Sequence, residues 1–553
     1  MKLKQVASYI RDHGVRGSAV LTADRLFGRK APEVSYELWQ SRNRPSSHDY
    51  LKMEKAVLPV KCKVAVTAMM NSADRTAFFQ SLEMQVYREF RALKNCNCPD
   101  YILIVNGPCT LRPDLLWECV SLIGQKGGSK VDLIYFDSDR IGRDGKKERP
   151  AFRPDFDPDL LEGVNYMGNV VFVNARAARL AGPLPDGDES FHAFLKRICL
   201  KEKGKDLSVE RMRIRHIPKV LYHVAEDPRA FTDGEESGWE TVTYAEGSGP
   251  SLGLSLREEP LISVLIPNRD HSQDLRRCID SLRHTNTWKR LEILILENHS
   301  TQQETFDLYR QLEAEDPRIR ILTWDGPFNY SAINQFGAAL AKGEYLLLLN
   351  NDTQILAPES LARMEELLTR PEVGAVGAVL LYPEGSVQHA GIILGHGGIA
   401  GHAWQGERLQ EILDDFPGLV FSHTHNVSAV TGACMMLRKD VWEKAGGMDE
   451  SLEVTFNDVD LCMRLRKDGY RVLMCPAACL LHYESASRGS EDSPAKVRRF
   501  HREIGIFVHR WEKELEAGDP FYNPCLTLKG KSWTCKDDLR ESTKPYVKYL
   551  KMM

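Results

Sequence analysis

The chain has 553 residues, room for about three or four domains of ordinary size, so a small disulfide-stapled protein is excluded. Hydrophobic residues make up 42% and charged residues 27%, which predicts packed cores and excludes wholesale disorder. The formal net charge of −4 argues against a dedicated nucleic-acid binder, so we expect no nucleic acid among the partners.

The sequence carries features of a cytoplasmic protein. Its thirteen cysteines lack regular spacing, which is typical of reduced thiols rather than of a disulfide framework. The N-terminus has no apolar core of signal-peptide length, and no stretch approaches the ~20 apolar residues that span a bilayer. Residues 1–55, a predicted helical arm, hold eleven basic and six acidic residues. This surplus could hold the arm against anionic lipid at the inner face of the membrane, although a solvated arm is an equally good interpretation.

A segment rich in Gly, Ser, Pro and acidic residues, 236–258, is a predicted linker between two unequal halves. After it come apolar runs at 261–267, 291–297, 319–324 and 344–350, with amphipathic helical stretches between them. Buried strands that alternate with helices predict an α/β fold, with a largely parallel sheet covered on both faces.

Polar residues follow three of these predicted strands, at Asn268-Arg269-Asp270, Glu297-Asn298 and Asn350-Asn351-Asp352. Ligands in open α/β sheets bind beyond the carboxyl ends of the strands, so we expect these residues to converge on one crevice. Asp352 is placed where a carboxylate can hold a hard divalent cation together with phosphate oxygens. The same three residues are also a common turn composition.

Two further candidates lie downstream. Asp458 and Asp460 fall in the first turn of a predicted helix, where a helix-capping role competes with that of a general base. His482 follows an apolar strand and could return to the crevice as a neutral metal ligand, although a lone His there is more often a surface or core residue.

Five histidines crowd into one part of the second half: His389, His396, His402, His423 and His425. Their spacing is not that of a metal motif, so we favour a loop-rich acceptor wall over a transition-metal site.

The first half weakly repeats the second. Each contains a strand and helix that begin with Gly and end in Ala-Gly, at 168–182 and 432–446, and each closes with a strand that carries Pro and His, at 216–223 and 474–483. The matched order predicts a duplicated domain rather than a short repeat. The stretch that precedes Gly168 is short, so the first half is predicted to lack some strands and helices.

Taken together, the second half resembles glycosyltransferase family 2, in particular the rhamnosyltransferase-like enzymes of bacterial surface polysaccharides. The matching segments occur in family order and include PLISVLIPNRD (260–270), DGPFNYSAINQFGAALAKGEYLLLLNNDT (325–353), NVSAVTGACMMLRKDVWEKAGGMDE (426–450), FNDVDLCMRLRKDGYRV (456–472) and LHYESASRG (481–489). The resemblance implies a GT-A fold and an inverting transfer that depends on Mn²⁺ or Mg²⁺. It also implies a dTDP- or UDP-sugar donor and a glycan, lipid-linked or protein acceptor.

By position, the resemblance assigns the nucleotide-sugar site to Pro267, Asn268, Arg269, Asp270, Glu297, Asn298, Asn334, Asn350 and Asn351. Glu297 stands where the family usually has an aspartate that contacts the base. Asn350 replaces the first acid of the family's Asp-any-Asp element. Asp352 and His482 would then bind the metal, and Asp458 would be the catalytic base.

The first half resembles the leading domain of longer two-transferase chains, on segments such as YELWQSRNRP (36–45) and VDLIYFDSDRIGRDGK (131–146). Asn106-Gly107-Pro108 stands where metal-binding acids would be, and Ser190-Phe191-His192 replaces an expected acidic pair. We therefore predict a degenerate transferase-like domain at 56–235, a catalytic domain at 259–518 and a C-terminal tail at 519–553.

Two alternatives stay open. Asp137 and Asp139 have the look of a metal motif, so both halves could be enzymatic. The chain could also be a non-catalytic scaffold that binds a glycan on a transferase fold.

Overall fold

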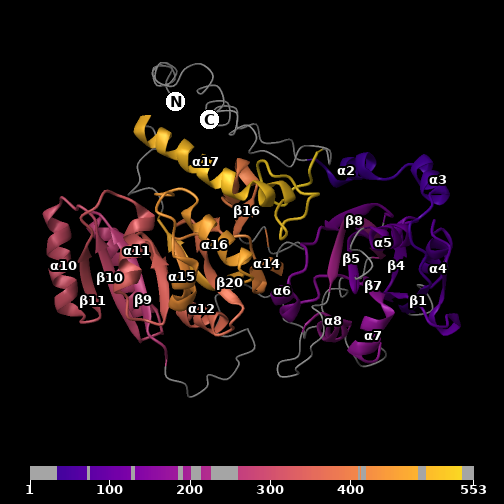
Figure 1. Ribbon diagram of the computed structural model, residues 1–553, viewed down its shortest axis with the longest axis horizontal. Coiled ribbons are helices and arrows are strands. Elements are labelled where there is room, and N and C mark those ends of the chain that lie inside the picture. Colours follow the sequence, from indigo (N-terminus) through magenta and orange to yellow (C-terminus); the bar gives the residue numbers. More distant parts are fainter. Residues whose placement is uncertain are drawn as a thin grey trace.

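The structure is a computed structural model that describes residues 34–70, 75–125, 131–142, 144–184, 191–200, 213–225, 259–408, 412, 419–483 and 494–537. The predicted linker, residues 1–33 of the predicted arm, Ser190 and residues 538–553 of the predicted tail lie outside these ranges. The described residues form two α/β units, drawn from indigo to purple and from magenta to yellow in Figure 1.

The second half is built on a ten-stranded mixed sheet of order β11-β10-β9-β12-β19-β14-β20-β13, with β15 paired to β14 and β18 to β20. Its strands are β9 (Ile262–Asn268), β10 (Leu291–Glu297), β11 (Ile319–Thr323), β12 (Tyr345–Leu349), β13 (Thr353–Ile355), β14 (Val373–Leu381), β15 (Val387–His389), β18 (His425–Asn426), β19 (Cys434–Arg438) and β20 (Arg471–His482). Strands β9 to β12 run parallel, whereas β19 is antiparallel to both of its neighbours. The four apolar runs predicted as strands are confirmed as β9, β10, β11 and β12.

Helices cover both faces of this sheet, because successive residues of its buried strands point to opposite sides. Along β9, Val264 and Ile266 pack into one core, while Leu265 packs into the other. The first core holds α9 (Ser272–Asp280), α10 (Gln303–Glu315) and α12 (Ser360–Leu368). The second holds α11 (Tyr330–Leu340), α15 (Lys439–Ala445), α16 (Asn457–Lys467) and α17 (Pro494–Ala517).

Smaller elements complete the second half. A hairpin of β16 (Ile392–Leu394) and β17 (Ala400–His402) stands apart from the main sheet, with the turn η5 (His396–Gly398) between its strands. The π turn η4 (Ser281–Thr285) follows α9, and α14 (Leu419–Ser422) precedes β18. Within the described ranges, no helix combines the length and the apolar character needed to cross a bilayer.

The first half is built on a smaller sheet of order β2-β1-β3-β7-β5-β8-β4, with β6 paired to β5. Its strands are β1 (Val64–Met69), β2 (Phe90–Ala92), β3 (Tyr101–Asn106), β4 (Cys109–Leu111), β5 (Leu133–Ile141), β6 (Lys147–Ala151), β7 (Val170–Asn174) and β8 (Ile214–Ala225). Helices α4 (Arg75–Glu83) and α5 (Leu115–Gly124) pack on one face, and α6 (Pro158–Gly163), α7 (Ala175–Ala181) and α8 (Phe191–Cys199) on the other. Before the sheet come α2 (Tyr36–Asn43) and α3 (Ser47–Lys55), and η1 (Leu93–Asn95) follows β2.

The strand pairings confirm the predicted duplication. In the first sheet β3 is parallel to β1 and antiparallel to β7, as β12 is to β9 and β19 in the second. Likewise β5 is parallel to β8 and β4 is antiparallel to β8, as β14 is to β20 and β13 to β20. Among the described residues β11 and β18 have no counterpart in the first sheet, which is the reduction that the short first half predicts.

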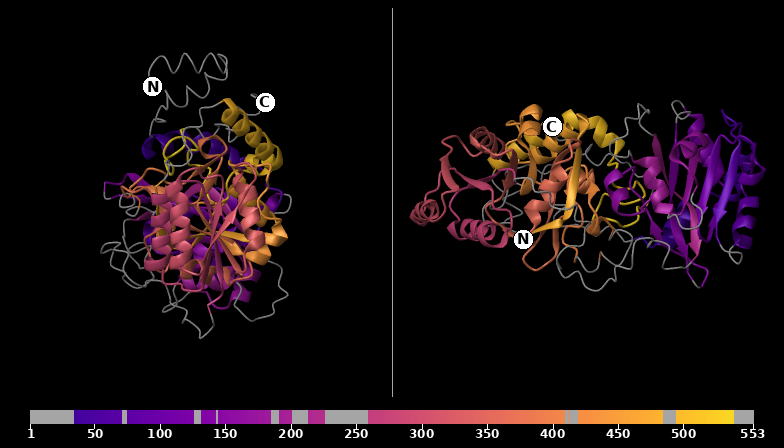
Figure 2. Two further views of the ribbon diagram at one scale, coloured as in Figure 1. Left: turned by 90° about the vertical axis from the view of Figure 1, so that its left-hand side faces the viewer. Right: turned by 90° about the horizontal axis from the view of Figure 1, so that it is seen from below.

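The two units meet in a buried polar junction. Asn426 donates its side-chain N–H to Asp157 at 2.6 Å and to Asp159 at 2.7 Å, and its backbone N–H to Asp157 at 2.8 Å. Farther along the junction, Asn523 donates to both oxygens of Asp137, at 3.1 and 2.9 Å. Segment 519–537 therefore packs between the units. The right-hand view of Figure 2 shows the first unit at one end of the molecule and the second unit at the other.

Candidate active site

The two predicted metal ligands come together at one edge of the second sheet. Asp352 lies in the turn between β12 and β13, and His482 is the last residue of β20, where it pairs with Thr353. Asp352 Oδ1 lies 3.1 Å from His482 Nε2, and the side chains are only 6% and 10% exposed. Asn350 Nδ2 lies 3.3 Å from the same Nε2. Chain reversal through β20 thus brings His482 beside Asp352.

Asp458 reaches the same crevice through the backbone of Gly432. Its Oδ2 accepts a hydrogen bond from the Gly432 N–H at 2.9 Å, and the Gly432 carbonyl accepts one from the Tyr330 hydroxyl at 2.8 Å. That hydroxyl also lies 3.5 Å from Asn350 Oδ1. The backbone of Gly432 therefore links the predicted base, through Tyr330, to the turn that carries Asp352.

The two acids at the start of α16 have different environments. The residue that caps the helix is Phe456, in a left-handed conformation with φ 61°, so neither acid is the cap. Asp460 is fully buried and accepts hydrogen bonds from Arg464, Arg510 and Trp511 at 2.8, 2.7 and 2.9 Å. Asp460 is thus committed to packing α17 against α16, whereas Asp458 is only half-buried and faces the crevice turn.

Four buried side chains form a chain of hydrogen bonds across the strand ends. Asn351 donates to Asn268 at 2.6 Å, Asn268 donates to the Tyr309 hydroxyl at 2.7 Å, and that hydroxyl donates to Glu297. Ser300 adds two donors to Glu297, its N–H and its hydroxyl, each at 2.6 Å. The Glu297 carboxylate, 4% exposed, is thereby occupied by protein groups and orients the crevice turn through Tyr309.

The other predicted nucleotide-site residues are spread around this crevice. The Asp270 carboxylate accepts the N–H groups of Thr301 and Gln302 at 2.8 and 2.9 Å. Burial pushes the Asp270 pKa upward, but these hydrogen bonds outweigh it and hold the pKa below its ordinary value. Asn298 donates to the carbonyls of Trp324 and Gly326, at 3.3 and 3.1 Å, and so fixes the loop before α11.

Three of the described residues predicted for the nucleotide-sugar site make no hydrogen bond to the predicted metal ligands. Pro267 lies within β9, opposite Leu296, and Arg269 is exposed just beyond that strand. Asn334 is fully buried in α11, where it donates to the carbonyl of Tyr330 at 2.8 Å. Within the described part of the chain, none of these three side chains hydrogen-bonds to Asp352 or His482.

Sequence reasoning missed two residues of the crevice, Tyr309 and Gln388. Tyr309 lies on α10 next to Leu308 and three residues before Leu312, a pattern that predicts a core position. Gln388 lies on β15, and its Oε1 is 2.5 Å from His482 Nδ1. A glutamine in a short strand gives no signal by itself, and only the return of β20 beside β14 brings it to the histidine.

The donor set at this edge fits a divalent cation. Mg²⁺ is commonly held by one or two carboxylates plus substrate phosphates, and imidazole nitrogen is an accepted ligand for transition metals. Within the described ranges, no group of three or more His, Cys, Asp or Glu side chains could hold a metal. The pair of Asp352 and His482 would therefore need oxygens from the donor diphosphate to complete the coordination.

Within the described ranges, the five crowded histidines form no group of three that could hold a metal. His389 and His402 face each other, with 2.8 Å between their Nδ1 atoms, and burial holds the pKa of His389 well below its ordinary value. His425, whose pKa burial lowers to about 4, lies at the junction, where its Nδ1 is 3.0 Å from the His423 carbonyl. The transition-metal hypothesis therefore finds no ligand group here, and the acceptor wall stays a prediction.

The first half places other groups where the second has its metal ligands. Asn106-Gly107-Pro108 forms the turn between β3 and β4, the counterpart of Asn350-Asn351-Asp352, so the first half has no acid at this turn. Cys109, the first residue of β4, pairs with Val224 as Thr353, the first residue of β13, pairs with His482, so Val224 takes the place of the histidine. The neighbouring His223 contacts Asp139. His192, at the start of α8, lies 2.6 Å from the Leu161 carbonyl.

Asp137 and Asp139, the acids that suggested a second active site, are fully engaged in packing. Asp139, 1% exposed, accepts hydrogen bonds from Tyr36 at 2.7 Å and from Gln40 at 2.8 Å, both on α2. Asp137 is completely buried and bonds to His216 at 2.9 Å as well as to Asn523. These contacts use the carboxylates to dock α2 and segment 519–537 on the first sheet.

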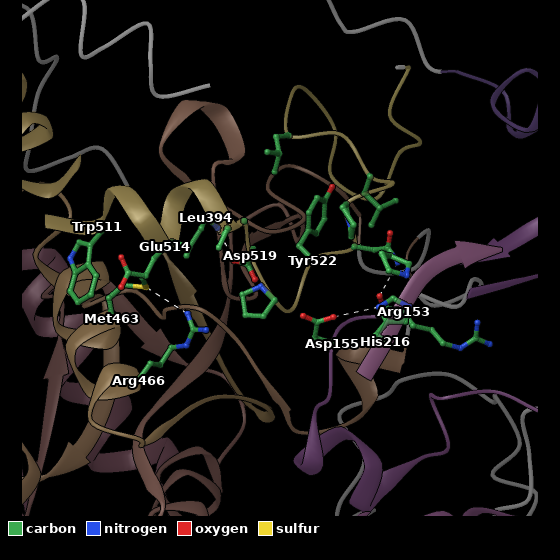
Figure 3. A pocket seen from close by; sticks show the side chains of 18 of the residues that line it. Arg153, Asp155, His216, Leu394, Met463, Arg466, Trp511, Glu514, Asp519 and Tyr522 are labelled. Atoms are coloured by element: carbon green, nitrogen blue, oxygen red, sulfur yellow. Dashed lines mark hydrogen bonds and ion pairs between the residues drawn. The ribbon is translucent and has the colours of Figure 1, made fainter. Parts of the chain in front are cut away.

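A separate cavity of about 530 Å³ lies at the junction of the two halves. Figure 3 shows side chains of the first half facing side chains of the second across it, among them Arg153, Asp155 and His216 opposite Arg466, Asp519 and Tyr522. Its lining includes none of the predicted site residues, and it contacts the end of α16 away from Asp458. The cavity is thus distinct from the crevice that holds Asp352.

Comparison with known proteins identifies relatives of this chain. It is 35% identical over 458 residues to the uncharacterized protein y4gI of Sinorhizobium fredii, covering 78% of this chain and 48% of the relative. It is 35% identical over 455 residues to the O-antigen biosynthesis protein RfbC of Myxococcus xanthus, covering 78% and 34%. An N-acetylglucosaminyl-diphospho-decaprenol L-rhamnosyltransferase of Mycobacterium tuberculosis is 26% identical over 275 residues, covering 45% and 83%.

The chain thus spans about half of the first relative and a third of the second. The family model described as "Glycosyltransferase like family 2" matches residues 260–505, which carry the mixed sheet, the Asp352–His482 pair and Asp458. The α/β fold and the family expected from the sequence are confirmed together: residues 260–505 are a glycosyltransferase domain of family 2.

Proposed function

We propose that this domain transfers a sugar from a dTDP- or UDP-sugar to a glycan, lipid-linked or protein acceptor, with inversion at the anomeric carbon, during synthesis of a bacterial surface polysaccharide. The observation that carries the proposal is the convergence of Asp352 and His482 to 3.1 Å, beside an Asp458 fixed through Gly432. The O-antigen and rhamnosyltransferase relatives support the same class of reaction.

Inversion requires a single displacement. The Asp458 carboxylate accepts the proton of the acceptor hydroxyl as that oxygen bonds to the anomeric carbon, and the bond from this carbon to the diphosphate breaks on the opposite face. The hydrogen bond from the Gly432 N–H holds Oδ2, so the carboxylate keeps its orientation during the transfer. Asp352 and His482 would hold a divalent cation, which would neutralise charge on the departing diphosphate.

Donor binding falls to the residues that surround the turn. Asn350 and Asn351 border Asp352, and the chain of hydrogen bonds through Asn268 and Tyr309 to Glu297 fixes their orientation. We assign Glu297 to this positioning role, because its buried carboxylate already accepts hydrogen bonds from the Ser300 N–H, the Ser300 hydroxyl and the Tyr309 hydroxyl. That assignment replaces the base contact that the family resemblance implies for its position.

The first half contributes no catalytic carboxylate in this proposal. Its Asp137 and Asp139 dock other segments, so the unit supports the transferase domain and can orient an acceptor. A lipid-linked acceptor would place the reaction at the inner face of the cell membrane, where the basic surplus of residues 1–55 favours anionic lipid.

Nucleotide release from a panel of UDP-, dTDP- and GDP-sugars, with Mn²⁺, Mg²⁺ or chelator, tests the proposal. We expect turnover of one donor that requires metal and is lost in Asp352→Ala and in Asp458→Asn. Asp440→Asn, which changes an acid 79% exposed on α15, is the matched control and should keep full activity. Nucleotide binding without turnover of any donor, across a range of acceptors, would support the scaffold alternative instead.

A further inference from the structure

The imidazole of His482 is held on both sides of its ring. Nε2 lies 3.1 Å from Asp352 Oδ1, and Nδ1 lies 2.5 Å from Gln388 Oε1. Gln388 is only 4% exposed and His482 8% exposed, so bulk water does not compete for either contact. Each ring nitrogen therefore has a defined protein partner.

The orientation of the Gln388 amide follows from its second contact. Its Nε2 lies 3.5 Å from the backbone carbonyl oxygen of His482, an atom that only accepts hydrogen bonds. The amide nitrogen must face that carbonyl, which leaves the amide oxygen to face His482 Nδ1. Since an amide oxygen cannot donate, Nδ1 is the ring nitrogen that carries the hydrogen.

We propose that Gln388 is a positioning residue, which holds His482 in the Nδ1–H tautomer and so reserves the Nε2 lone pair for the divalent cation bound with Asp352. Without a cation or a proton between them, the Nε2 lone pair and the carboxylate oxygen repel each other at 3.1 Å. A cation in contact with both atoms relieves that repulsion. The inference rests on the metal site of the proposed function and assigns a role to a residue outside the ligand pair.

A residue that hydrogen-bonds to the ring nitrogen away from the metal orients a metal-bound histidine and raises its affinity for the metal. Loss of such a residue typically weakens metal binding by about 10- to 100-fold. The structure also offers a close control. Gln354 on β13 is near the same edge, but its Oε1 accepts a hydrogen bond from the Tyr483 hydroxyl at 2.8 Å. Gln354→Ala removes a half-buried amide from the same edge of the sheet and leaves the partner of His482 Nδ1 unchanged.

The first measurement is ¹⁵N NMR of the metal-free full chain with labelled histidine, in which His482→Gln assigns the His482 signals. We expect the hydrogen on Nδ1 in the wild type and in Gln354→Ala, and a mixture of tautomers in Gln388→Ala. The second measurement is Mn²⁺ binding in the presence of UDP or dTDP, whose diphosphate oxygens complete the coordination, followed by electron paramagnetic resonance. Gln388→Ala should weaken binding by about 10- to 100-fold, whereas Gln388→Glu, which keeps an acceptor oxygen toward Nδ1, should retain it.

The outcomes separate this inference from the proposed function. A hydrogen on Nε2 with none on Nδ1 in the wild type, or wild-type Mn²⁺ affinity in Gln388→Ala while Asp352→Ala loses it, overturns the role of Gln388 alone. Unchanged Mn²⁺ affinity in Asp352→Ala overturns the metal site itself, and with it the function that we propose. If Gln388→Ala does not fold, the wild-type ¹⁵N spectrum alone still decides the tautomer, because a neutral ring with its hydrogen on Nε2 overturns the role of Gln388.

Discussion

Removing the Tyr309 hydroxyl tests whether the buried hydrogen-bond chain positions the crevice. In Tyr309→Phe, Glu297 keeps its two bonds from Ser300, at 2.6 Å each, but loses its third donor. Asn268 loses the acceptor at 2.7 Å and keeps only the Asp270 carbonyl at 3.1 Å. Leaving a buried group without its partner costs about 1–3 kcal/mol, so we expect the free energy of unfolding to fall by about 2 kcal/mol.

The same variant should change catalysis in a defined way. Asn351 donates to Asn268 at 2.6 Å, and a loosened Asn268 frees the turn that carries Asp352. Because this affects ground-state binding of the donor, KM for the nucleotide-sugar should rise more than kcat falls.

Urea unfolding and steady-state nucleotide release measure the two effects of Tyr309→Phe. Tyr382→Phe is the matched control, since its hydroxyl accepts from an exposed Gln405 at 3.0 Å, and we expect a change below about 1 kcal/mol there. A loss below about 0.5 kcal/mol in Tyr309→Phe, with unchanged KM, would refute the positioning role of the chain.

Three further predictions follow from the site and the junction. Asp458→Asn should lower kcat by about 10²- to 10⁴-fold with little change in donor KM, because a carboxamide cannot accept the proton; nucleotide-release kinetics measure both, and an unchanged kcat removes Asp458 from the role of base. Burial and then the charge of Asp159 raise the pKa of Asp157 from 3.8 to about 6. The folded state therefore binds this proton more tightly than the unfolded chain, so the stability it contributes is present below about pH 4 and is lost as pH rises through about 6; thermal melting of Asp157→Asn should lack that slope, and an equal slope would contradict the assignment. Asp139→Asn should lower the melting temperature by loosening Tyr36 on α2, yet leave the transferred linkages unchanged; product analysis that shows a missing linkage would instead reveal a second active site.

The sequence predicted the central strands well, because their burial on both faces leaves an unbroken apolar run. The runs at 291–297 and 344–350 correspond to β10 and β12 within one residue at each end. The duplication was equally accessible, since the Gly-led strand and the Pro-and-His strand keep their order in both halves. Their spatial equivalents, β7 with β19 and β8 with β20, have matching pairings.

The hydrogen-bond partners of the site side chains could not be predicted from the sequence. Glu297 ends a strand at the predicted crevice, yet its carboxylate faces Tyr309 and Ser300, because α10 packs against this end of the sheet. Asp458 and Asp460 lie two residues apart on one helix turn, and only the packing of α17 brings Arg510 to Asp460. Hydrogen-bond direction depends on neighbours far away in sequence, which a motif does not encode.

The junction between the halves determines how the protein unfolds. Trp39 and Phe152 of the first half contact each other with ring centroids 5.2 Å apart, and both belong to the hydrophobic core that also holds Trp511 of α17. Unfolding of either unit would expose that shared core and would break the hydrogen bonds from Asn426 to Asp157 and Asp159. We therefore expect the part of the chain that unfolds cooperatively to include both halves, and so to extend beyond residues 260–505, which match the family. Calorimetry of the whole chain should accordingly record one transition in which both sheets melt together.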